Sequence, residues 1–470
     1  MTGTCRVLAL ASAMILVGFV HALHRDPAQP QGETAVGQAL LSAWWADATA
    51  QDRRHETTAS ALTVPHGALA HGKQAPAGPV QAQNDEFEAL LRRFGPEYDG
   101  LAAKIAVAIH KGVEFLVSQQ RADGTWELRE ADYPLGGTAL CALAVRKSLV
   151  GLYEGDERER DREVRRLERD ERAQRLRPEQ VERLRYLREQ APAELALRQR
   201  FEPHVQRAID ALRVRYHELE RNNRLKVYCV GAVLMLLEAV YTKRRANAQG
   251  QSVVGIEPGD IRADDLAWVR RMVTWLATRS VTPMYMRQQV GGRAWRYPYA
   301  LEDSNVDLSC TQYAVLGLKA AARMGVRVPD ATLWRQVADY LIATQQPDGV
   351  QVRRNPPGVD AFGRYRSRPV DPNAPYDRAR AWAYLAQPKE DGTHLYSGAM
   401  TCAGLAVLVT AKSELYAANI LPGNRTLERA IDTAIADGIC WMGARFTVAR
   451  NPVENPAEPE QHGGWHYYYL

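Results

Sequence analysis

The sequence predicts an all-α protein, an α/α barrel in which apolar inner helices are ringed by amphipathic outer helices. Two observations support this fold class. Hydrophobic residues at helical spacing recur along residues 105–442 in segments that follow one another in pairs. Within each pair the first segment carries a charged face and the second is apolar nearly all round. Because a helix that is apolar on every side must be buried, the second segments are expected to lie inside.

The expected outer helices cover residues 105–119, 205–219, 266–278, 333–344 and 427–442. The expected inner helices cover residues 138–150, 227–241, 307–323 and 397–412. The inner segments resemble one another, since TALCALAV, VYCVGAVLML, LSCTQYAVLGL and MTCAGLAVLV each place a cysteine about one turn into the helix. The spacing of the pairs is too irregular for the common short solenoid repeats, which favours closure of the helices into a barrel.

The first 98 residues are expected to lie outside this barrel. Residues 1–22 have the pattern of a signal peptide, in which Arg6 precedes an apolar run and Ala22 ends at a cleavage site. An uncleaved membrane anchor is the alternative, although the apolar run is short for a full span. Residues 23–98 are rich in Ala, Gln, Pro and Gly and are expected to form a flexible leader. These patterns predict an exported, periplasmic or extracellular protein with its barrel at residues 99–470.

One strongly charged segment interrupts the pairs. More than half of residues 154–200 are charged, with acidic and basic side chains nearly in balance, and Pro178 and Pro192 mark expected helix starts. Such a segment buries little surface, so it is expected to project from the barrel as charged helices. It serves either as a solvated spacer or as a docking arm for a protein partner.

The overall composition is that of a globular protein and does not indicate nucleic acid as a partner. The chain has 470 residues, 46% of them hydrophobic and 24% charged, with a formal net charge of +5. Most basic residues are interleaved with acidic ones and no nucleic-acid-binding motif accompanies them.

The stretch KGVEFLVSQQRADGTW, residues 111–126, carries a family resemblance. It matches the Gln-Trp repeat motif of squalene and oxidosqualene cyclases, and the chain therefore resembles the terpenoid cyclase and protein prenyltransferase superfamily, whose members fold as α/α toroids. A degenerate copy keeps Gln345, Gln346 and Gly349 but has Gln351 in the aromatic position. Weaker copies end at Trp295 and Trp465.

The motif has a structural explanation. The last carbonyls of a helix lack intrahelical partners, and a glutamine placed there can donate amide hydrogens to them or to a neighbouring helix. A glycine permits the turn after the helix, and the tryptophan ring can pack over the loop. We expect these residues to join adjacent outer helices: Gln119, Gln120, Gly124, Trp126, Gln345, Gln346 and Gly349.

The resemblance implies a catalytic acid that the sequence does not supply in the usual form. Triterpene cyclases of this superfamily protonate a carbon–carbon double bond with an acid from an Asp-x-Asp-Asp motif, which is absent here. The candidate catalytic acids are Glu302, Asp303 and Asp307. Asp307 opens an inner helix, so the alternative is that it caps that helix through backbone N–H groups.

The other activities of the superfamily are not indicated either. Protein prenyltransferases hold zinc through Asp, Cys and His, but Asp307 and Cys310 are one residue too far apart and no matching histidine is evident. The thioester sequence of complement domains is also absent. We therefore expect no metal and no cofactor.

Two long connections, residues 280–306 and 347–396, precede inner helices and should gather at one mouth of the barrel. They contain aromatic and arginine side chains that suit a ligand with an apolar body and a polar or anionic head, or that pack the loops. The candidate ligand-binding residues are Trp295, Tyr297, Arg366, Trp382 and Tyr384.

Three hypotheses for function remain. The first is a toroid that binds a hydrophobic, isoprenoid-like ligand or a protein partner at its mouth. The second is an active terpenoid-cyclase-type enzyme with a non-standard acid. The third is an exported polysaccharide-degrading enzyme on an α/α barrel, for which no carboxylate pair stands out.

Overall fold

The structure is a computed structural model. It describes residues 101–126, 134–152, 157–189, 191–246, 252–285, 288–289, 291–297, 306–353, 358–359, 365–366, 373, 376–386, 394–446 and 451–453. The expected signal peptide and leader lie outside the described residues. Among the described residues, no helix is long and apolar enough to cross a membrane.

The protein is mostly helical, and a helix is found at each range expected from the sequence, with most ends shifted by a few residues and the start of α8 shifted from residue 205 to Ala191. The inner helices are α5 (Pro134–Leu152), α9 (Val227–Tyr241), α11 (Leu308–Arg323) and α13 (Gly398–Ala417). The outer helices are α4 (Leu101–Ser118), α8 (Ala191–Arg221), α10 (Ala263–Arg279), α12 (Thr332–Thr344) and α14 (Arg425–Arg445). One large hydrophobic cluster runs through both sets and contains the buried faces of all four inner helices.

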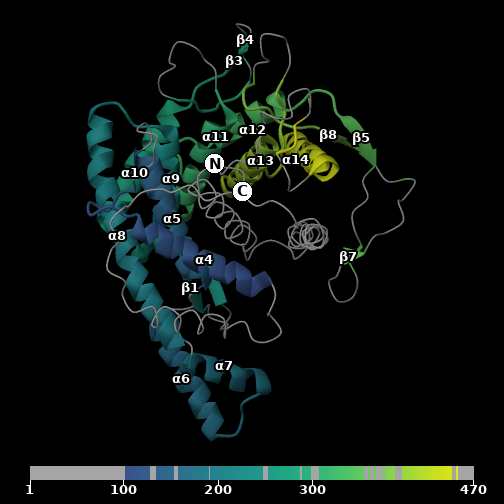
Figure 1. Cartoon of the computed structure of the whole chain (residues 1–470). Coiled ribbons are helices and arrows are strands. Elements are labelled where there is room, and N and C mark those ends of the chain that lie inside the picture. Colours follow the sequence, from purple (N-terminus) through teal and green to yellow (C-terminus); the bar gives the residue numbers. More distant parts are fainter. Residues whose placement is uncertain are drawn as a thin grey trace, which may run out of the picture.

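The inner helices contact one another in the order α5, α9, α11, α13 and run in the same direction (Figure 1). At their starts, the Tyr228 hydroxyl of α9 donates to Ser309 of α11. At their ends, Glu238 of α9 pairs with Arg323 of α11, and Lys319 of α11 pairs with Glu414 of α13. Because α9 and α11 contact each other both at their starts and at their ends, the two helices run parallel. The starts of the inner helices therefore lie on one side of the molecule.

Two glycines allow α9 and α11 to approach closely. A Cβ atom built on Gly231 would lie 2.3 Å from the carbonyl oxygen of Tyr313, and one built on Gly317 would lie 2.7 Å from the Cα atom of Gly231. Real Cβ atoms essentially never come this close to backbone, so a larger residue at either position would push the helices apart.

A tryptophan joins each of three outer helices to the inner helix that follows. The indole N–H groups of Trp126, Trp295 and Trp382 donate to carbonyl oxygens near the ends of α4, α10 and α12, at 2.7, 2.8 and 2.8 Å. Their backbone N–H groups donate to threonine hydroxyls in the first turns of α5, α11 and α13: Thr138, Thr311 and Thr401. We call this arrangement the tryptophan clamp. Its recurrence identifies three structural repeats.

The glutamines of the Gln-Trp motif reach the next outer helix, as expected from the sequence. The side-chain amide of Gln120 donates to the carbonyl oxygen of His204 in α8 at 2.9 Å and to that of Gly124 at 3.0 Å. The amide of Gln345 donates to the carbonyl oxygen of Ala434 in α14 at 2.9 Å. Gln119, in contrast, is exposed and bonds only its neighbour Ser118 among the interactions described.

The third copy of the motif is complete but interrupted, which corrects the view that Gln351 stands in the aromatic position. Gln346 and Ala381 exchange two hydrogen bonds across the base of an insertion, and Trp382 follows as the clamp residue. The insertion carries β5 (Val350–Arg353) paired with β8 (Tyr376–Ala379), and β6 (Gly358–Val359) paired with β7 (Tyr365–Arg366).

Two more short antiparallel ribbons occur outside the helical core. The pair β3 (Met284–Tyr285) and β4 (Gln288–Gln289) precedes Trp295 in the second clamp repeat. The pair β1 (Lys243–Ala246) and β2 (Ser252–Gly255) follows α9. None of these ribbons was expected, because each is too short for a clear alternating pattern.

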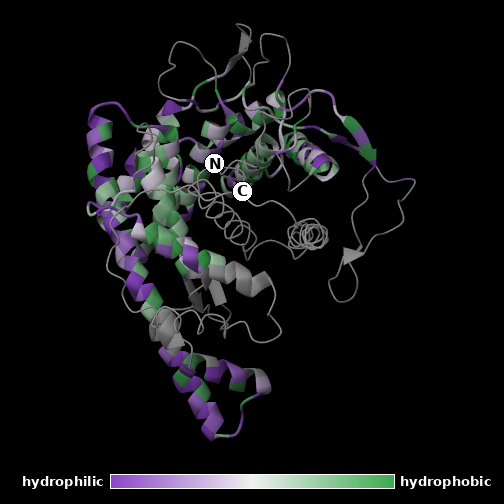
Figure 2. Ribbon diagram, in the orientation of Figure 1, coloured by the Kyte–Doolittle hydropathy of each residue, from purple (hydrophilic) through white to green (hydrophobic). Residues whose placement is uncertain are grey.

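The charged segment forms helices that project from the body of the protein, as the sequence predicts. Helices α6 (Glu157–Arg172) and α7 (Pro178–Glu189) form a hairpin at the far end of α8 (Figure 1), and most of its surface is hydrophilic (Figure 2). A small separate cluster of Leu167, Leu184 and Leu187 holds the two helices together. The boundary predicted at residue 200 is wrong, because α8 begins at Ala191 and continues through Pro203.

Candidate functional site

The starts of the inner helices meet the loops that contain the clamp tryptophans. The backbone N–H of Asp307 donates to the carbonyl oxygen of Trp295 at 3.1 Å, and that of Leu308 donates to the carbonyl oxygen of Tyr384 at 3.0 Å. These bonds bring the two long connections together above α11. The described parts of the two connections therefore meet at the start of α11.

Asp307 caps α11 at this mouth. Its Oδ1 atom accepts hydrogen bonds from the Cys310 backbone N–H at 2.6 Å and from the Ser309 hydroxyl at 2.7 Å. The residue is only 2% exposed. Burial raises the pKa of its carboxyl, while the bonds from Cys310 and Ser309 and the charge of Arg296 oppose that rise. The capping interpretation is confirmed.

Three tyrosines surround this cap. The hydroxyl of Tyr228 donates to Ser309, and its ring stacks on that of Tyr297 with a centroid separation of 5.6 Å. The Tyr228 side chain opposes the rise in the pKa of Tyr297, and Ser309 and Tyr297 oppose the rise in the pKa of Tyr384, so these hydroxyl groups lie near one another. Burial raises the pKa of all three tyrosines, that of Tyr384 to about 12, so all three are neutral at physiological pH.

Arg296 adds a positive charge to this region. Its Nε and Nη1 atoms are buried and have no hydrogen-bond partner within the part of the chain that the structure describes. Its charge partly offsets the rise in the pKa of Asp307 and of Cys310. A buried donor without an acceptor costs about 1–3 kcal/mol, and more when it is charged. The guanidinium is therefore prepared to bind an acceptor, preferably an anion.

We define the mouth cluster as these seven residues: Tyr228, Arg296, Tyr297, Asp307, Ser309, Cys310 and Tyr384. Of the candidate ligand-binding residues, Tyr297 and Tyr384 belong to it. Trp295 and Trp382 are fully buried clamp residues behind it. Arg366 lies in β7, and its side chain is outside the described residues, as are Glu302 and Asp303. The structure thus brings Asp307 together with Tyr297 and Tyr384.

Sequence reasoning missed Tyr228, Arg296, Ser309 and Cys310 as members of one site. Two signals could have found most of them. The sequences AWRY at residues 294–297 and AWAY at residues 381–384 repeat a tryptophan and a tyrosine two positions apart. Tyr228 and Ser309 each stand directly before the cysteine of an inner helix.

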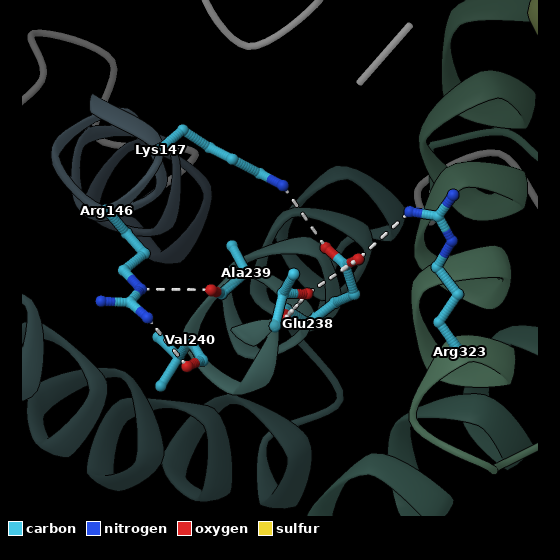
Figure 3. A network of polar contacts seen from close by, with 7 residues as sticks. Arg146, Lys147, Glu238, Ala239, Val240 and Arg323 are labelled. Carbon is cyan, nitrogen blue, oxygen red and sulfur yellow. Dashed lines mark hydrogen bonds and ion pairs between the residues drawn. The ribbon is translucent and has the colours of Figure 1, made fainter. Parts of the chain in front are cut away.

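A second polar network lies at the opposite ends of the inner helices (Figure 3). The carboxylate of Glu238 in α9 pairs with Lys147 Nζ of α5 at 3.6 Å and with Arg323 Nη1 of α11 at 3.2 Å. Arg146 of α5 donates to the carbonyl oxygens of Ala239 and Val240 at the end of α9. These charges have partners within the protein, so the network fixes the packing of three helices and is a weaker candidate for binding or catalysis than the mouth cluster.

The cysteines do not form a reactive or metal-binding group in the described part of the chain. Cys141, Cys229, Cys310, Cys402 and Cys440 are unpaired. Burial raises the pKa of each thiol, so each is protonated and a weak nucleophile at neutral pH. The described residues contain no cluster of three or more His, Cys, Asp or Glu side chains that could hold a metal ion.

Comparisons with known proteins give no identity for the chain. No protein-family model, no curated protein and no solved structure matches it.

Proposed function

We propose that this is an exported α/α-toroid protein that binds an elongated hydrophobic, isoprenoid-like ligand at its mouth. The ligand's polar or anionic head lies against the mouth cluster, and its apolar body lies against the rings of the mouth tyrosines. The proposal is supported by the parallel inner helices, the repeated clamps and the resemblance of residues 111–126 to the Gln-Trp motif.

The observation that carries this function is that the Nε and Nη1 atoms of Arg296 are buried without a hydrogen-bond partner among the residues that the structure describes. Its Nε–H and Nη1–H groups leave the planar guanidinium in different directions, and each can donate a charge-assisted hydrogen bond to an acceptor oxygen such as that of a phosphate or carboxylate. Burial strengthens the electrostatic attraction because little water competes for the donors.

The three tyrosines of the mouth cluster favour a ligand that has both a polar head and an apolar body. The hydroxyls of Tyr228, Tyr297 and Tyr384 form a chain that can donate to or accept from a bound oxygen, and their rings offer apolar contact area directly beside it. A ligand with a polar end and an apolar body satisfies both surfaces, whereas a fully polar ligand leaves the rings without apolar contacts.

A cyclase reaction started by Asp307 is less well supported. An acid that protonates a double bond must present its proton to the substrate, but the Oδ1 atom of Asp307 accepts two hydrogen bonds from α11. The cyclase alternative then depends on Glu302 or Asp303, and the polysaccharide-degrading alternative gains no carboxylate pair among the described residues.

Thermal unfolding of the full chain with two defined probes tests the proposal. We expect farnesyl phosphate to raise the unfolding temperature more than farnesol, because only the ester supplies an anion; a probe at 100 times its Kd adds about 2.7 kcal/mol of stability. Loss of charged hydrogen bonds worth about 1.5–3 kcal/mol in Arg296→Met should weaken binding of farnesyl phosphate roughly 10- to 100-fold.

The matched control is Arg335→Met on the outer helix α12, where the arginine side chain is 56% exposed. This variant should bind farnesyl phosphate like the parent protein. Equal responses of Arg296→Met and the parent protein would exclude Arg296 as the anion-binding residue. No response of the parent protein to either probe would refute the isoprenoid-like ligand.

A further inference from the structure

The outer face of α6 carries a row of arginine side chains. Arg162, Arg165, Arg169 and Arg172 recur at intervals of three and four residues, so they lie on one face of the helix, and Arg166 lies beside them. All five are exposed. Within the described residues, no carboxylate pairs with the first four. We call these five residues the arginine row.

The acidic residues on the opposite face of α6 are already paired with α7. Glu163 pairs with Arg183 at 2.9 Å. Glu168 and Glu171 pair with Arg188 at 3.3 and 2.9 Å. These ion pairs hold the hairpin together, and the arginine row faces away from α7. Because the hairpin projects from the body of the protein (Figure 1), a partner can approach this face.

The arginine row is narrow. At about 100° per residue, Glu163 and Asp170 lie beside one of its edges, and Asp161 and Glu168 lie beside the other. The hairpin as a whole, residues 157–189, contains twelve basic and ten acidic residues, a net charge of +2. The positive charge that a partner can use is therefore confined to a line along one helix face.

This arrangement disfavours broad anionic partners. A bilayer surface or a nucleic-acid duplex would bring its own negative charges against the carboxylates at the edges, and its attraction depends on a large excess of basic residues. A helix that enters a bilayer also needs large apolar side chains, and α6 exposes none among its described residues. A partner as narrow as the row avoids both penalties.

We propose that the arginine row binds an acidic α-helix of a partner protein. From Arg162 to Arg172 the row covers about 15 Å of helix, and glutamates spaced three and four residues apart on an adjacent helix repeat over the same distance. Charge pairs of this kind along two helices set the choice and orientation of the partner. The contact is small and exposed, so the complex is transient and weakens as salt rises.

Fluorescence anisotropy with the full chain tests the partner's chemistry. The first probe is a labelled helical peptide with the repeating sequence Glu-Ala-Ala-Glu-Ala-Ala-Ala, which places its glutamates on one face. The second has the same composition with the glutamates on all sides of the helix. We expect the first peptide to bind at low salt and the second to bind at least about fivefold more weakly.

Replacement of arginines by glutamine locates the binding surface. Arg162→Gln, Arg165→Gln, Arg169→Gln and Arg172→Gln together should weaken binding of the first peptide about 10- to 100-fold, as expected from four exposed charge pairs. If this variant does not fold in circular dichroism, Arg162→Gln with Arg169→Gln should weaken binding about three- to tenfold. The matched control should bind like the parent protein. It loses four exposed arginines of the outer helices α8, α10 and α12: Arg215, Arg270, Arg271 and Arg335.

The outcomes that would overturn the proposal are distinct. Failure of the first peptide to bind, equal binding of the two peptides, or equal binding by the parent protein and the arginine-row variant would each exclude an acidic helix as the partner. Tighter binding of single-stranded DNA of equal charge, or of phosphatidylserine vesicles, than of the first peptide would assign the surface to nucleic acid or to a membrane instead.

Discussion

Replacement of Trp382 by phenylalanine tests the tryptophan clamp at the position where the sequence motif is interrupted. Trp382 is fully buried, and its indole N–H donates to the carbonyl oxygen of Leu341 at 2.8 Å. Cβ atoms built on Gly404 and Gly438 would each lie 2.6 Å from the ring, so the indole fills a slot between α13 and α14. Phenylalanine keeps part of the ring and loses the donor.

The structure gives the size of the effect. Leaving the Leu341 carbonyl without its donor costs about 1–3 kcal/mol. The smaller ring buries roughly 50 Å² less apolar surface, which adds about 1 kcal/mol. We therefore expect Trp382→Phe to lower the free energy of unfolding by about 2–4 kcal/mol. At about 2–4 °C per kcal/mol, the unfolding temperature should fall by roughly 5–15 °C.

Urea unfolding followed by circular dichroism measures this change. The control is Trp275→Phe in the outer helix α10, where the half-buried ring lies under the guanidinium of Arg279 at 5.5 Å. That substitution should cost less than about 1 kcal/mol, as expected for a partly exposed aromatic side chain. Equal urea midpoints for the two variants, with equal slopes, would refute the clamp as a stabilising element.

Three further results are expected. Gly231→Ala should destabilise the protein by about 1–3 kcal/mol, because the new Cβ atom would meet the Tyr313 carbonyl oxygen. Gly443→Ala, where a Cβ atom would meet no atom within 4 Å, should instead stabilise α14 by up to about 1 kcal/mol. Equal urea midpoints for the two variants would contradict this. Replacing residues 354–375 by a two-residue turn should change the unfolding temperature by only a few degrees, because the β5–β8 pair and the bond from Arg378 to Asp437 of α14 are kept; loss of folding in circular dichroism would contradict this. Burial raises the pKa of Asp307 in the folded state, so the stabilising contribution of this carboxyl is complete below its unfolded-state pKa of about 3.8 and is lost as pH rises through the folded-state pKa. Asp307→Asn should therefore gain stability relative to the parent protein between pH 4 and pH 7. A difference in urea midpoint that stays constant over this range would contradict the raised pKa.

The helices could be predicted from the sequence because their signal is local. The pairing of charged-face and apolar segments predicts α9 to the residue and most other helices within a few residues of their ends, although α8 starts fourteen residues before its expected start. The bonds of Gln120 and Gln345 also follow from the motif, because a glutamine at a helix end needs only a neighbouring helix within reach.

The mouth cluster could not be assembled from the sequence because its members come from separated segments. The third clamp is hidden by an insertion that separates Gln346 from Ala381 by 35 positions. Trp295 and Trp382 have the residue type of a ligand pocket, and only their indole bonds show that they hold the loops instead. The isolation of Arg296 is a property of packing, which no local pattern encodes.

A high-resolution crystal structure of the full chain, purified without added ligand, tests the central claim most directly. We predict electron density for a bound acceptor oxygen within about 3 Å of Nε or Nη1 of Arg296, continuing into an apolar chain. An Arg296 guanidinium paired with the Asp307 carboxylate, or turned into solvent with no density beside it, would contradict the account.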